Sequence, residues 1–499
     1  MPGRKDYVSV KQDGNRIHVQ KRLVLNNLKQ LYHEFKERLP SLKIGFSKFA
    51  SLRPKQCILA GAAGTHSVCV CTIHQNVKLM FHTIKLPDLN TYHDCLGKIM
   101  CNPPSQFCCL GECPVCPDIH LFKEELLSSL EKAVVDEIIF KQWVSTDRSS
   151  LETFYLSAED FVDLFCEKLE ALRPHSFIAK QQADFFSTRK TSLKTGEVLV
   201  VADFSENYSF VLQDASQGFH WNNSQATLHP FVAYYMESNE LRELSFVIIS
   251  DCLHHDTIAV YTFQKSFINF LKTFLPTHLH PSKLIYFSDG AASQYKNRKN
   301  FSNLCFHQED FGISAEWHFS ATSHGKGACD GLGGTVKRLA ARASLQRPYN
   351  NQIMTPRQLY EWASTTIHAV HFAYSTVEDY MREAEQLEQR FTSSRTIPGT
   401  RKYHSFIPAS RNTVKVALYS SDDRYKEEKV TLVGSGLSPE SITGFVTCKL
   451  EDKWWLACVI EVIQDNSNVQ ITLLHPHGPS RSFKYPVSED IRTVHIQYR

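Results

Sequence analysis

The stretch Glu197-Val-Leu-Val-Val-Ala-Asp203 decides the fold expected for this chain of 499 residues. A short apolar run rich in β-branched residues predicts a buried strand, here followed directly by an acid. Similar runs predict further strands, and apolar residues at helical spacing predict helices, the first of them capped by Asp256. The strands are expected at 227–236, 241–251, 284–289 and 315–320, and the helices at 257–275, 294–310 and 335–345. The order β-β-β-α-β-α-β-α predicts an α/β domain whose mixed sheet is covered by helices.

Three aspartates fall at matching places in this pattern. Asp203 and Asp289 each follow a predicted strand, and Asp330 opens a predicted helix in His324-Gly-Lys-Gly-Ala-Cys-Asp330. Carboxylates that meet at one sheet edge can hold two Mg²⁺ or Mn²⁺ ions for phosphodiester chemistry. Taken singly, each acid also fits a turn or a helix cap. Together they are predicted as the catalytic metal ligands, with five other acids held in reserve: Glu206, Asp251, Glu309, Asp310 and Glu316.

Polar and basic residues near these acids are candidates for contacting a phosphate backbone. We expect that role for Gln294, Lys296, His324 and Lys326. The formal net charge of the whole chain is only +3. Local basic clusters therefore carry the prediction of a DNA partner, and solvated helix faces are the alternative interpretation of those clusters.

The first part of the chain is rich in cysteine, with nine of the 15 cysteines before residue 117. Such clustering in a reducing compartment favours zinc over disulfides, and the Cys-x-x-Cys pair at 113 and 116 has the spacing of a tetrahedral site. The preferred ligands are Cys109, Cys113 and Cys116, together with Cys69, Cys71 or His74, in one site or two. Cys57, His66, Cys95 and Cys101 are reserves, and buried free thiols are the alternative, above all for Cys95 and Cys108.

The last part of the chain changes character again. Short β-branched runs broken by Asn, Gly and Pro predict a small SH3-like or Tudor-like barrel over residues 440–499. Its aromatic residues either line a groove for a peptide, a methylated lysine or a nucleic acid, or fill the barrel core. These residues are Trp454, Trp455, Phe483 and Tyr485.

Length and composition predict several domains in an intracellular protein. The chain has no apolar run of about 18 residues and no apolar segment near Met1, which argues against a membrane span and a signal peptide. An intracellular protein with a DNA partner is expected in the nucleus. The expected divisions are 1–120 (helices and zinc ligands), 121–190 (helical linker), 191–395 (core with a helical extension), 396–439 (linker) and 440–499 (barrel).

Several phrases of the sequence resemble a group of invertebrate proteins derived from DDE-type transposases. They are Gly64-Thr-His-Ser-Val-Cys-Val-Cys-Thr-Ile-His, Cys109-Leu-Gly-Glu-Cys, Ala202-Asp-Phe-Ser-Glu-Asn-Tyr, Ser288-Asp-Gly-Ala-Ala-Ser-Gln-Tyr-Lys-Asn and His324-Gly-Lys-Gly-Ala-Cys-Asp-Gly. The resemblance covers most of the chain. It implies an RNase H-like core with Asp203, Asp289 and Asp330 as metal ligands.

Two functions follow as alternatives. The first is metal-dependent DNA cleavage and strand transfer. The second is a domesticated transposase that binds nucleic acid or chromatin without catalysis. No helix-turn-helix for recognising transposon ends is evident, which is expected of a truncated or domesticated protein. A second copy of the chain remains open as a further partner.

Overall fold

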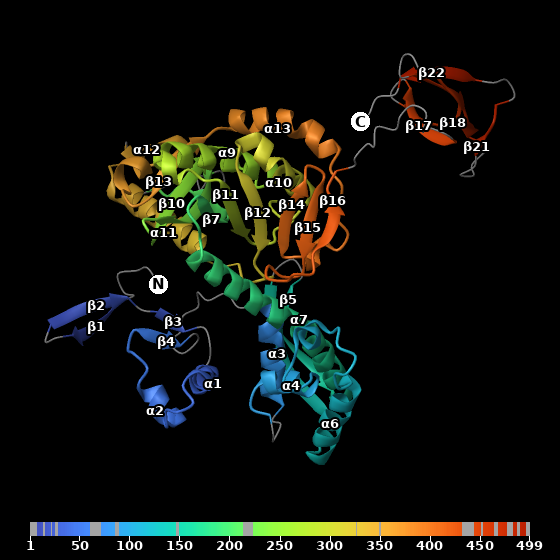
Figure 1. The fold of residues 1–499 in the computed structure, drawn as a ribbon. Coiled ribbons are helices and arrows are strands. Elements are labelled where there is room, and N and C mark those ends of the chain that lie inside the picture. Colours follow the sequence, from blue (N-terminus) through green and yellow to red (C-terminus); the bar gives the residue numbers. More distant parts are fainter. Residues whose placement is uncertain are drawn as a thin grey trace.

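The computed structural model describes most of the chain (Figure 1). The described residues are 7–12, 15–20, 22–24, 28–59, 71–84, 89–145, 149–212, 223–325, 327–348, 351–431, 444–450, 453–463, 468–476, 483–486 and 490–495. Among the described helices, none has both the length and the apolarity that a bilayer crossing requires.

The largest unit is a ten-stranded mixed sheet. Along the sheet its strands are β13 (His371–Ser375), β10 (Glu240–Ser250), β9 (Gln225–Glu237), β7 (Glu197–Ala202), β11 (Lys283–Ser288), β12 (Ser314–Phe319), β14 (Ser405–Ser410), β15 (Thr413–Ala417) and β16 (Lys426–Lys429), with β8 (Ser205–Ser209) pairing with β9. Strands β7, β11 and β12 are parallel neighbours, whereas β9 runs antiparallel to both β7 and β10. The predicted mixed sheet is therefore confirmed, and the initial meander is β7, β9 and β10.

Helices cover both faces of this sheet (Figure 1). One layer contains α9 (Thr257–Phe274), α10 (Arg298–Phe311) and α13 (Val377–Thr392), and the other contains α11 (Ala328–Gln346) and α12 (Pro356–Thr366). Successive side chains of β7 point to opposite faces of the sheet. Val198 and Val200 pack in the core under α9, and Leu199 packs in the core on the other face. As expected, Asp256 caps α9 by accepting the N–H groups of Ile258 and Ala259.

Residues 71–173 form a second unit with its own apolar core. It contains α3 (Thr72–Thr83), α4 (Tyr92–Lys98), α5 (Gln106–Leu110), α6 (Ile119–Lys132), the hairpin of β5 (Glu137–Ser145) and β6 (Ser149–Ser157), and the first half of α7 (Ala158–Thr191). Ahead of it lie β1 (Tyr7–Gln12), β2 (Asn15–Gln20), β3 (Arg22–Val24), α1 (Leu28–Arg38), α2 (Phe46–Ser51) and β4 (Cys57–Leu59). The N-terminal region thus contains strands as well as the expected helices.

Helix α7 joins the two units (Figure 1). Its first half buries Phe161, Phe165 and Leu169 in the second unit, and its second half packs Phe185 and Phe186 against the sheet. The segment 121–190 is therefore no plain helical linker, because it includes a hairpin and part of two cores. The helix also continues through Pro174. We attribute this to burial on both sides of the proline, which outweighs the lost backbone hydrogen bond.

The structure also differs from expectation at residues 396–439. The segment begins with a 3₁₀ turn at Thr400–Lys402, and β14, β15 and β16 then extend the large sheet from β12 instead of forming a linker. Another 3₁₀ turn, outside this segment, lies at Thr277–Leu279. Val414 and Val416 alternate into the core beneath α10, so these strands belong to the central domain.

The C-terminal part is a separate antiparallel sheet. It contains β17 (Phe445–Leu450), β18 (Lys453–Ile463), β19 (Asn468–Leu473) and β22 (Ile491–His495), with β20 (His475–Pro476) paired to β21 (Phe483–Lys484). Ala457, Val469 and Ile471 are buried in its small core, and Trp455 packs against them. The side chain of Trp454 lies outside the described residues.

Candidate active site and metal centres

Asp203 and Asp289 stand side by side at the carboxyl ends of β7 and β11. These strands are parallel neighbours in which Val201 pairs with Phe287, so the two residues beyond them fall at the same level. Asp289 Oδ1 accepts the N–H of Ala291 at 3.1 Å. The sheet register thus places two carboxylates at one edge.

Asp330 reaches the same place from the first turn of α11. Its Oδ2 accepts the N–H of the N-cap residue Gly327 at 2.9 Å, so Asp330 supports the cap from the third helical position and is not itself the N-cap considered as an alternative. Asp203, Asp289 and Asp330 nevertheless line one cavity of about 680 Å³. Asp330 therefore contributes to the helix cap and also lines the acidic cavity, although the carboxylates of the three acids are not among the described groups whose ligand atoms all lie within 4.8 Å of one another.

The surroundings of Asp203 and Asp289 disfavour the charged form of these two carboxylates. Burial, and then the negative charges of Asp289 and Asp330, raise the pKa of Asp203 to about 7. Burial also raises the pKa of Asp289, with Asp330 contributing repulsion. Half-buried acids of like charge are stabilised by protons or by cations. A bound proton or cation beside Asp203 and Asp289 would therefore relieve this repulsion.

Two glycines allow the chain to close around the acids. A Cβ atom at Gly325 would lie 3.0 Å from Cβ of Asp289. A Cβ atom at Gly333 would lie 2.9 Å from Cβ of Ser205 and 2.6 Å from its Oγ. Because Gly333 follows Asp330 by one helical turn, the close approach of α11 to β8 helps to bring Asp330 over the strand ends.

This packing leads to a first prediction. Gly333→Ala should push α11 from β8 and lower the free energy of unfolding by about 1–3 kcal/mol, as overpacking does. Gly334→Ala is the matched control, since a Cβ atom there meets nothing within 4 Å. The free energy of unfolding of this control should rise by up to about 1 kcal/mol, because alanine has a higher helix propensity than glycine. Urea denaturation measures both, and equal stabilities would contradict a tight contact at Gly333.

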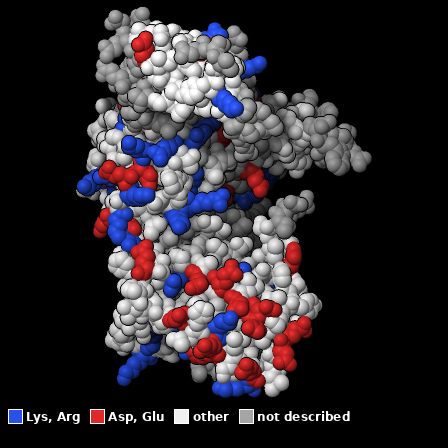
Figure 2. All heavy atoms as spheres, turned by 90° about the vertical axis from the view of Figure 1, so that its right-hand side faces the viewer, with Lys and Arg blue, Asp and Glu red and all other residues white. Residues whose placement is uncertain are grey.

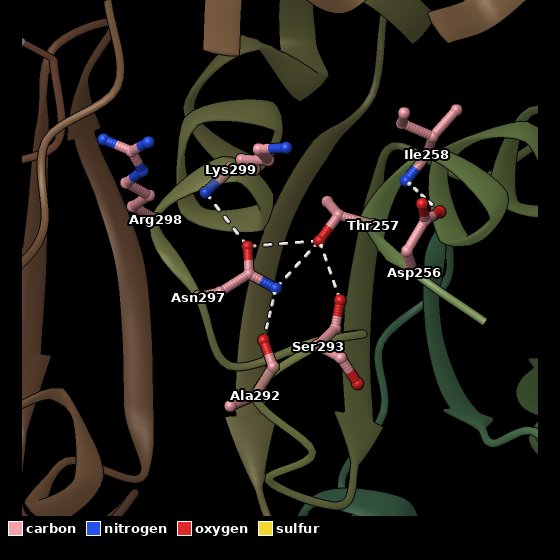
Figure 3. A pocket seen from close by; sticks show the side chains of 8 residues that line it. All are labelled: Asp256, Thr257, Ile258, Ala292, Ser293, Asn297, Arg298 and Lys299. Atoms are coloured by element: carbon pink, nitrogen blue, oxygen red, sulfur yellow. Dashed lines mark hydrogen bonds between the residues drawn. The ribbon is translucent and has the colours of Figure 1, made fainter. Parts of the chain in front are cut away.

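The segment after Asp289 is held by Asn297 (Figure 3). Asn297 Nδ2 donates to the carbonyl of Ala292 and to Thr257 Oγ1, each at 2.8 Å. Its Oδ1 accepts the N–H groups of Lys299 and Asn300 and so caps α10. The sequence predicted that this helix begins at residue 294. The cap explains why α10 begins at Arg298 instead. The turn that carries Gln294 and Lys296 is fixed as a result.

Of the four expected phosphate contacts, Gln294 and Lys296 line the cavity of the three aspartates. Lys296 Nζ donates to the carbonyl of Arg401 at 3.1 Å, and burial lowers the pKa of this lysine to about 8. Arg401 also lines the cavity, although its sequence context gave no reason to select it. Lys326 lies outside the described residues.

Four of the reserve acids serve other contacts. Asp310 pairs with Arg390, Glu316 with Lys283 and His318, Glu309 with Arg411, and Asp251 accepts the hydroxyl of Tyr374. Glu206 lies near Lys337, and neither it nor the other four lines the acidic cavity.

A first candidate metal centre contains four cysteines: Cys101, Cys108, Cys113 and Cys116. Their sulfur atoms lie within 4.8 Å of one another, and Cys101 Sγ is 3.9 Å from the sulfur atoms of both Cys113 and Cys116. A tetrahedral zinc with bonds of about 2.3 Å separates its sulfur ligands by about 3.8 Å. This group could therefore hold a metal such as zinc.

The expected pair Cys113 and Cys116 lies in this group, but Cys109 does not. Successive residues of a helix point about 100° apart. Helix α5, which Ser105 caps, turns Cys108 toward the group and Cys109 away from it. The predicted set thus contained Cys109 where the structure groups Cys108, and it held Cys101 only in reserve.

Adjacent cysteines provide a second prediction with an internal control. Cys113→Ser should remove one zinc ion per chain and destabilise the 71–173 unit by several kcal/mol, because metal binding there contributes to folding. Cys109→Ser should keep the full zinc content. Elemental analysis and thermal denaturation report on both. Loss of zinc from Cys109→Ser alone would contradict the ligand set.

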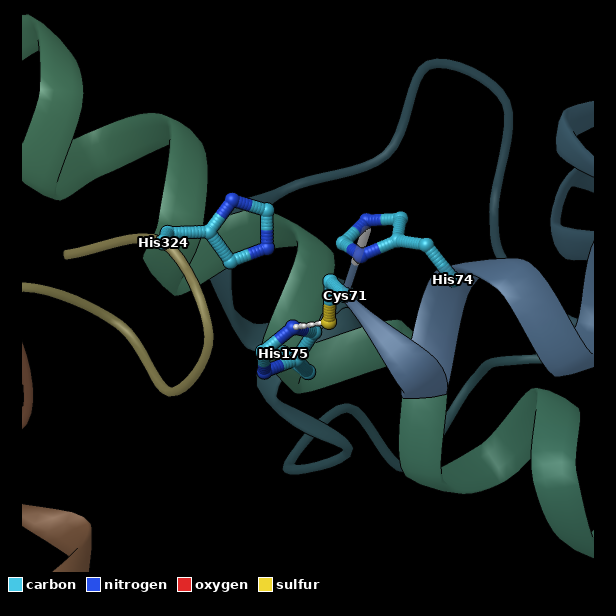
Figure 4. A group of neighbouring side chains, drawn as sticks. All are labelled: Cys71, His74, His175 and His324. Atoms are coloured by element: carbon cyan, nitrogen blue, oxygen red, sulfur yellow. Dashed lines mark hydrogen bonds between the residues drawn. The ribbon is translucent and has the colours of Figure 1, made fainter. Parts of the chain in front are cut away.

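A second candidate centre contains Cys71, His74, His175 and His324, whose ligand atoms also lie within 4.8 Å of one another (Figure 4). Cys71 and His74 were expected as zinc ligands, but they do not join Cys113 and Cys116. His324 was expected at a phosphate and instead lies in this group, although it also lines a cavity with Asp203 and Asp289. His175 was not predicted as a ligand, because its partners are about 100 and 150 residues away in the sequence. Cys69 lies outside the described residues.

Comparison with known families gives three matches, each described as a domain of unknown function. DUF8699 matches residues 1–61, DUF8700 residues 72–173 and DUF8701 residues 182–420. The second and third agree with the two units joined by α7, and the third includes β14 and β15. No curated protein and no solved structure matches the chain.

Proposed function

We propose that this protein performs metal-dependent phosphodiester chemistry on DNA, as a relative of DDE-type transposases. The observation that carries the proposal is the meeting of Asp203, Asp289 and Asp330 in one cavity, from two strand ends and one helix. The central strand order β10-β9-β7-β11-β12, with β9 antiparallel to its neighbours, supports an RNase H-like core.

Within this proposal the residues have distinct roles. Asp203, Asp289 and Asp330 would together hold the divalent ions, and Asp203 feels the negative charge of both of the other acids. Such ions, when bound, stabilise the attacking and leaving oxygens of an in-line displacement. Lys296 and Arg401, which line the same cavity, would contact the phosphate and orient it.

The distribution of surface charge supports an anionic partner for the domain that contains the ten-stranded sheet. Figure 2 shows lysine and arginine side chains gathered at the height of the ten-stranded sheet, with some acidic side chains among them, whereas acidic side chains predominate at the height of the helical unit below it. The net charge of +3 hides this uneven distribution. Positive charge near a site attracts the phosphate backbone without reading its sequence. A nuclear location follows from a DNA substrate and belongs to the same proposal.

Nicking of supercoiled plasmid tests the proposal. The purified full chain should convert supercoiled DNA to the open-circular form in Mn²⁺ or Mg²⁺, and neither Ca²⁺ nor a chelator should support the reaction. The activity should fall steeply with added salt, because the phosphate contacts are electrostatic. Absence of nicking, together with absence of Mn²⁺ binding, would contradict the proposal.

The C-terminal sheet supports a second, non-catalytic candidate function. Phe445, Phe483 and Tyr485 are 63%, 47% and 61% exposed, which is unusual for aromatic side chains on a small domain. We propose that this SH3-like or Tudor-like barrel binds a peptide or nucleic acid through them. Tyr485→Ala should then weaken binding of fluorescent single-stranded DNA or histone-tail peptide to the full chain. Unchanged binding of both ligands would contradict this role.

A further inference from the structure

The group of Cys71, His74, His175 and His324 spans the junction between the two large units. Cys71 is the residue directly before α3, and His74 lies in the first turn of that helix. His175 lies in α7, between the parts of that helix that pack into the two cores. His324 follows β12 and so belongs to the sheet domain. Neither the 72–173 match nor the 182–420 match contains all four residues.

The donors suit zinc in number, kind and position. Cys71 Sγ lies 3.2 Å from Nε2 of His175, and the three imidazole rings have centroids 5.0–5.2 Å apart. Nδ1 of His74 is buried and has no hydrogen-bond partner in the part of the chain that the structure describes. A tetrahedral ion bound by one thiolate and three neutral imidazoles would satisfy that atom. Figure 4 shows the four side chains converging from α3, α7 and the loop after β12.

The chain leads directly from this group to the acidic cavity. His324 is followed by Gly325, whose ideal Cβ position lies 3.0 Å from Cβ of Asp289. The N–H of Gly327 then bonds to Asp330. On the other side of His324, the carbonyl of Thr322 lies 3.9 Å from Cys71 Sγ. A shift of His324 therefore moves both the contact with Asp289 and the start of α11.

We propose that Cys71, His74, His175 and His324 bind a zinc ion that clamps the helical unit to the sheet domain and positions the loop between β12 and α11. His324 is then a positioning residue that acts on Asp330 through the chain. This inference rests on the proposed function only where it concerns catalysis. The clamp itself is independent of what the aspartates do.

The experiment compares His324→Ala with His324→Cys in the full-length protein. His278→Ala is the control, since His278 is an exposed histidine outside both groups. Zinc content, hydrogen exchange of the amides between Ser320 and Gly325, and Mn²⁺ affinity by electron paramagnetic resonance are the three readouts. His324→Ala should lose one of two zinc ions, exchange these amides at least tenfold faster, and bind Mn²⁺ at least tenfold more weakly. His324→Cys, which supplies a thiolate ligand, should restore zinc and slow exchange, and the control should match the wild type.

Each outcome decides the proposal. A wild-type protein with only the four-cysteine zinc would overturn it. Zinc loss in His324→Ala without faster exchange would also overturn it, because the ion would then not position the loop. If the wild type binds no Mn²⁺ while zinc and exchange behave as expected, the clamp stands and the proposed catalytic function fails.

Discussion

Replacing Asp289 by asparagine is expected to reduce Mn²⁺-dependent DNA nicking by more than about 100-fold, and Asp203→Asn and Asp330→Asn should do the same. An amide keeps the size of the side chain but removes the charge that holds a divalent ion. The loss of one such electrostatic contact in a preorganised site typically costs about two to three orders of magnitude in rate. Nicking assays at saturating Mn²⁺ measure the effect.

The control for this series is Asp423→Asn. Asp423 is exposed and lies outside the acidic cavity. It should retain wild-type activity, as should any change that spares the three carboxylates and their supports. Nicking that survives in Asp203→Asn and Asp289→Asn would show that these acids do not hold the reactive ions, and the non-catalytic binding function would take the place of the enzyme.

The pH dependence of stability should distinguish a buried acid from an ordinary one. Burial and the two neighbouring carboxylates raise the pKa of Asp203 from its ordinary value of 3.8 to about 7 in the folded protein. The folded state therefore holds this proton more tightly than the unfolded state. The contribution of Asp203 is fully present below pH 4 and is lost as pH rises toward 7. Because of this one group, the free energy of unfolding at pH 8 should be lower than at acid pH by at most about 4 kcal/mol.

Asp203→Asn isolates this contribution, because the variant shares every other titrating group with the wild type. In divalent-free buffer the two proteins should unfold alike at pH 4, and the variant should become the more stable by about 2–4 kcal/mol at pH 8. Mn²⁺ at about 100 times its dissociation constant should return about 2.7 kcal/mol to the wild type and nothing to the variant. A difference between the two proteins that does not change with pH would contradict the raised pKa.

The sheet and the acidic site could be predicted because their signals are local. Each of Asp203 and Asp289 directly follows a run of buried strand residues, and parallel pairing of β7 and β11 makes them neighbours. Asp330 comes near the other two acids only because α11 approaches closely at Gly333, and the glycine-rich sequence permits this approach. The roles of these acids in catalysis stay a prediction.

The metal centres were harder to predict because their geometry is not local. Spacing brought Cys113 and Cys116 into the predicted set, and both lie in the four-cysteine group, whereas the choice between Cys108 and Cys109 depends on the direction of one short helix. His175 and His324 meet Cys71 only after α7 has joined the two units. Strands β14 to β16 were missed for a similar reason, since Val414 and Val416 are buried by a helix, α10, far away in the sequence.

The decisive measurement is anomalous diffraction from crystals of the full chain soaked in Mn²⁺. We expect manganese peaks among the carboxylates of Asp203, Asp289 and Asp330, separated by about 4 Å if two ions bind. These peaks should disappear in Asp203→Asn. Manganese bound elsewhere, with this cavity empty in the wild type, would show that the three aspartates hold no divalent ion.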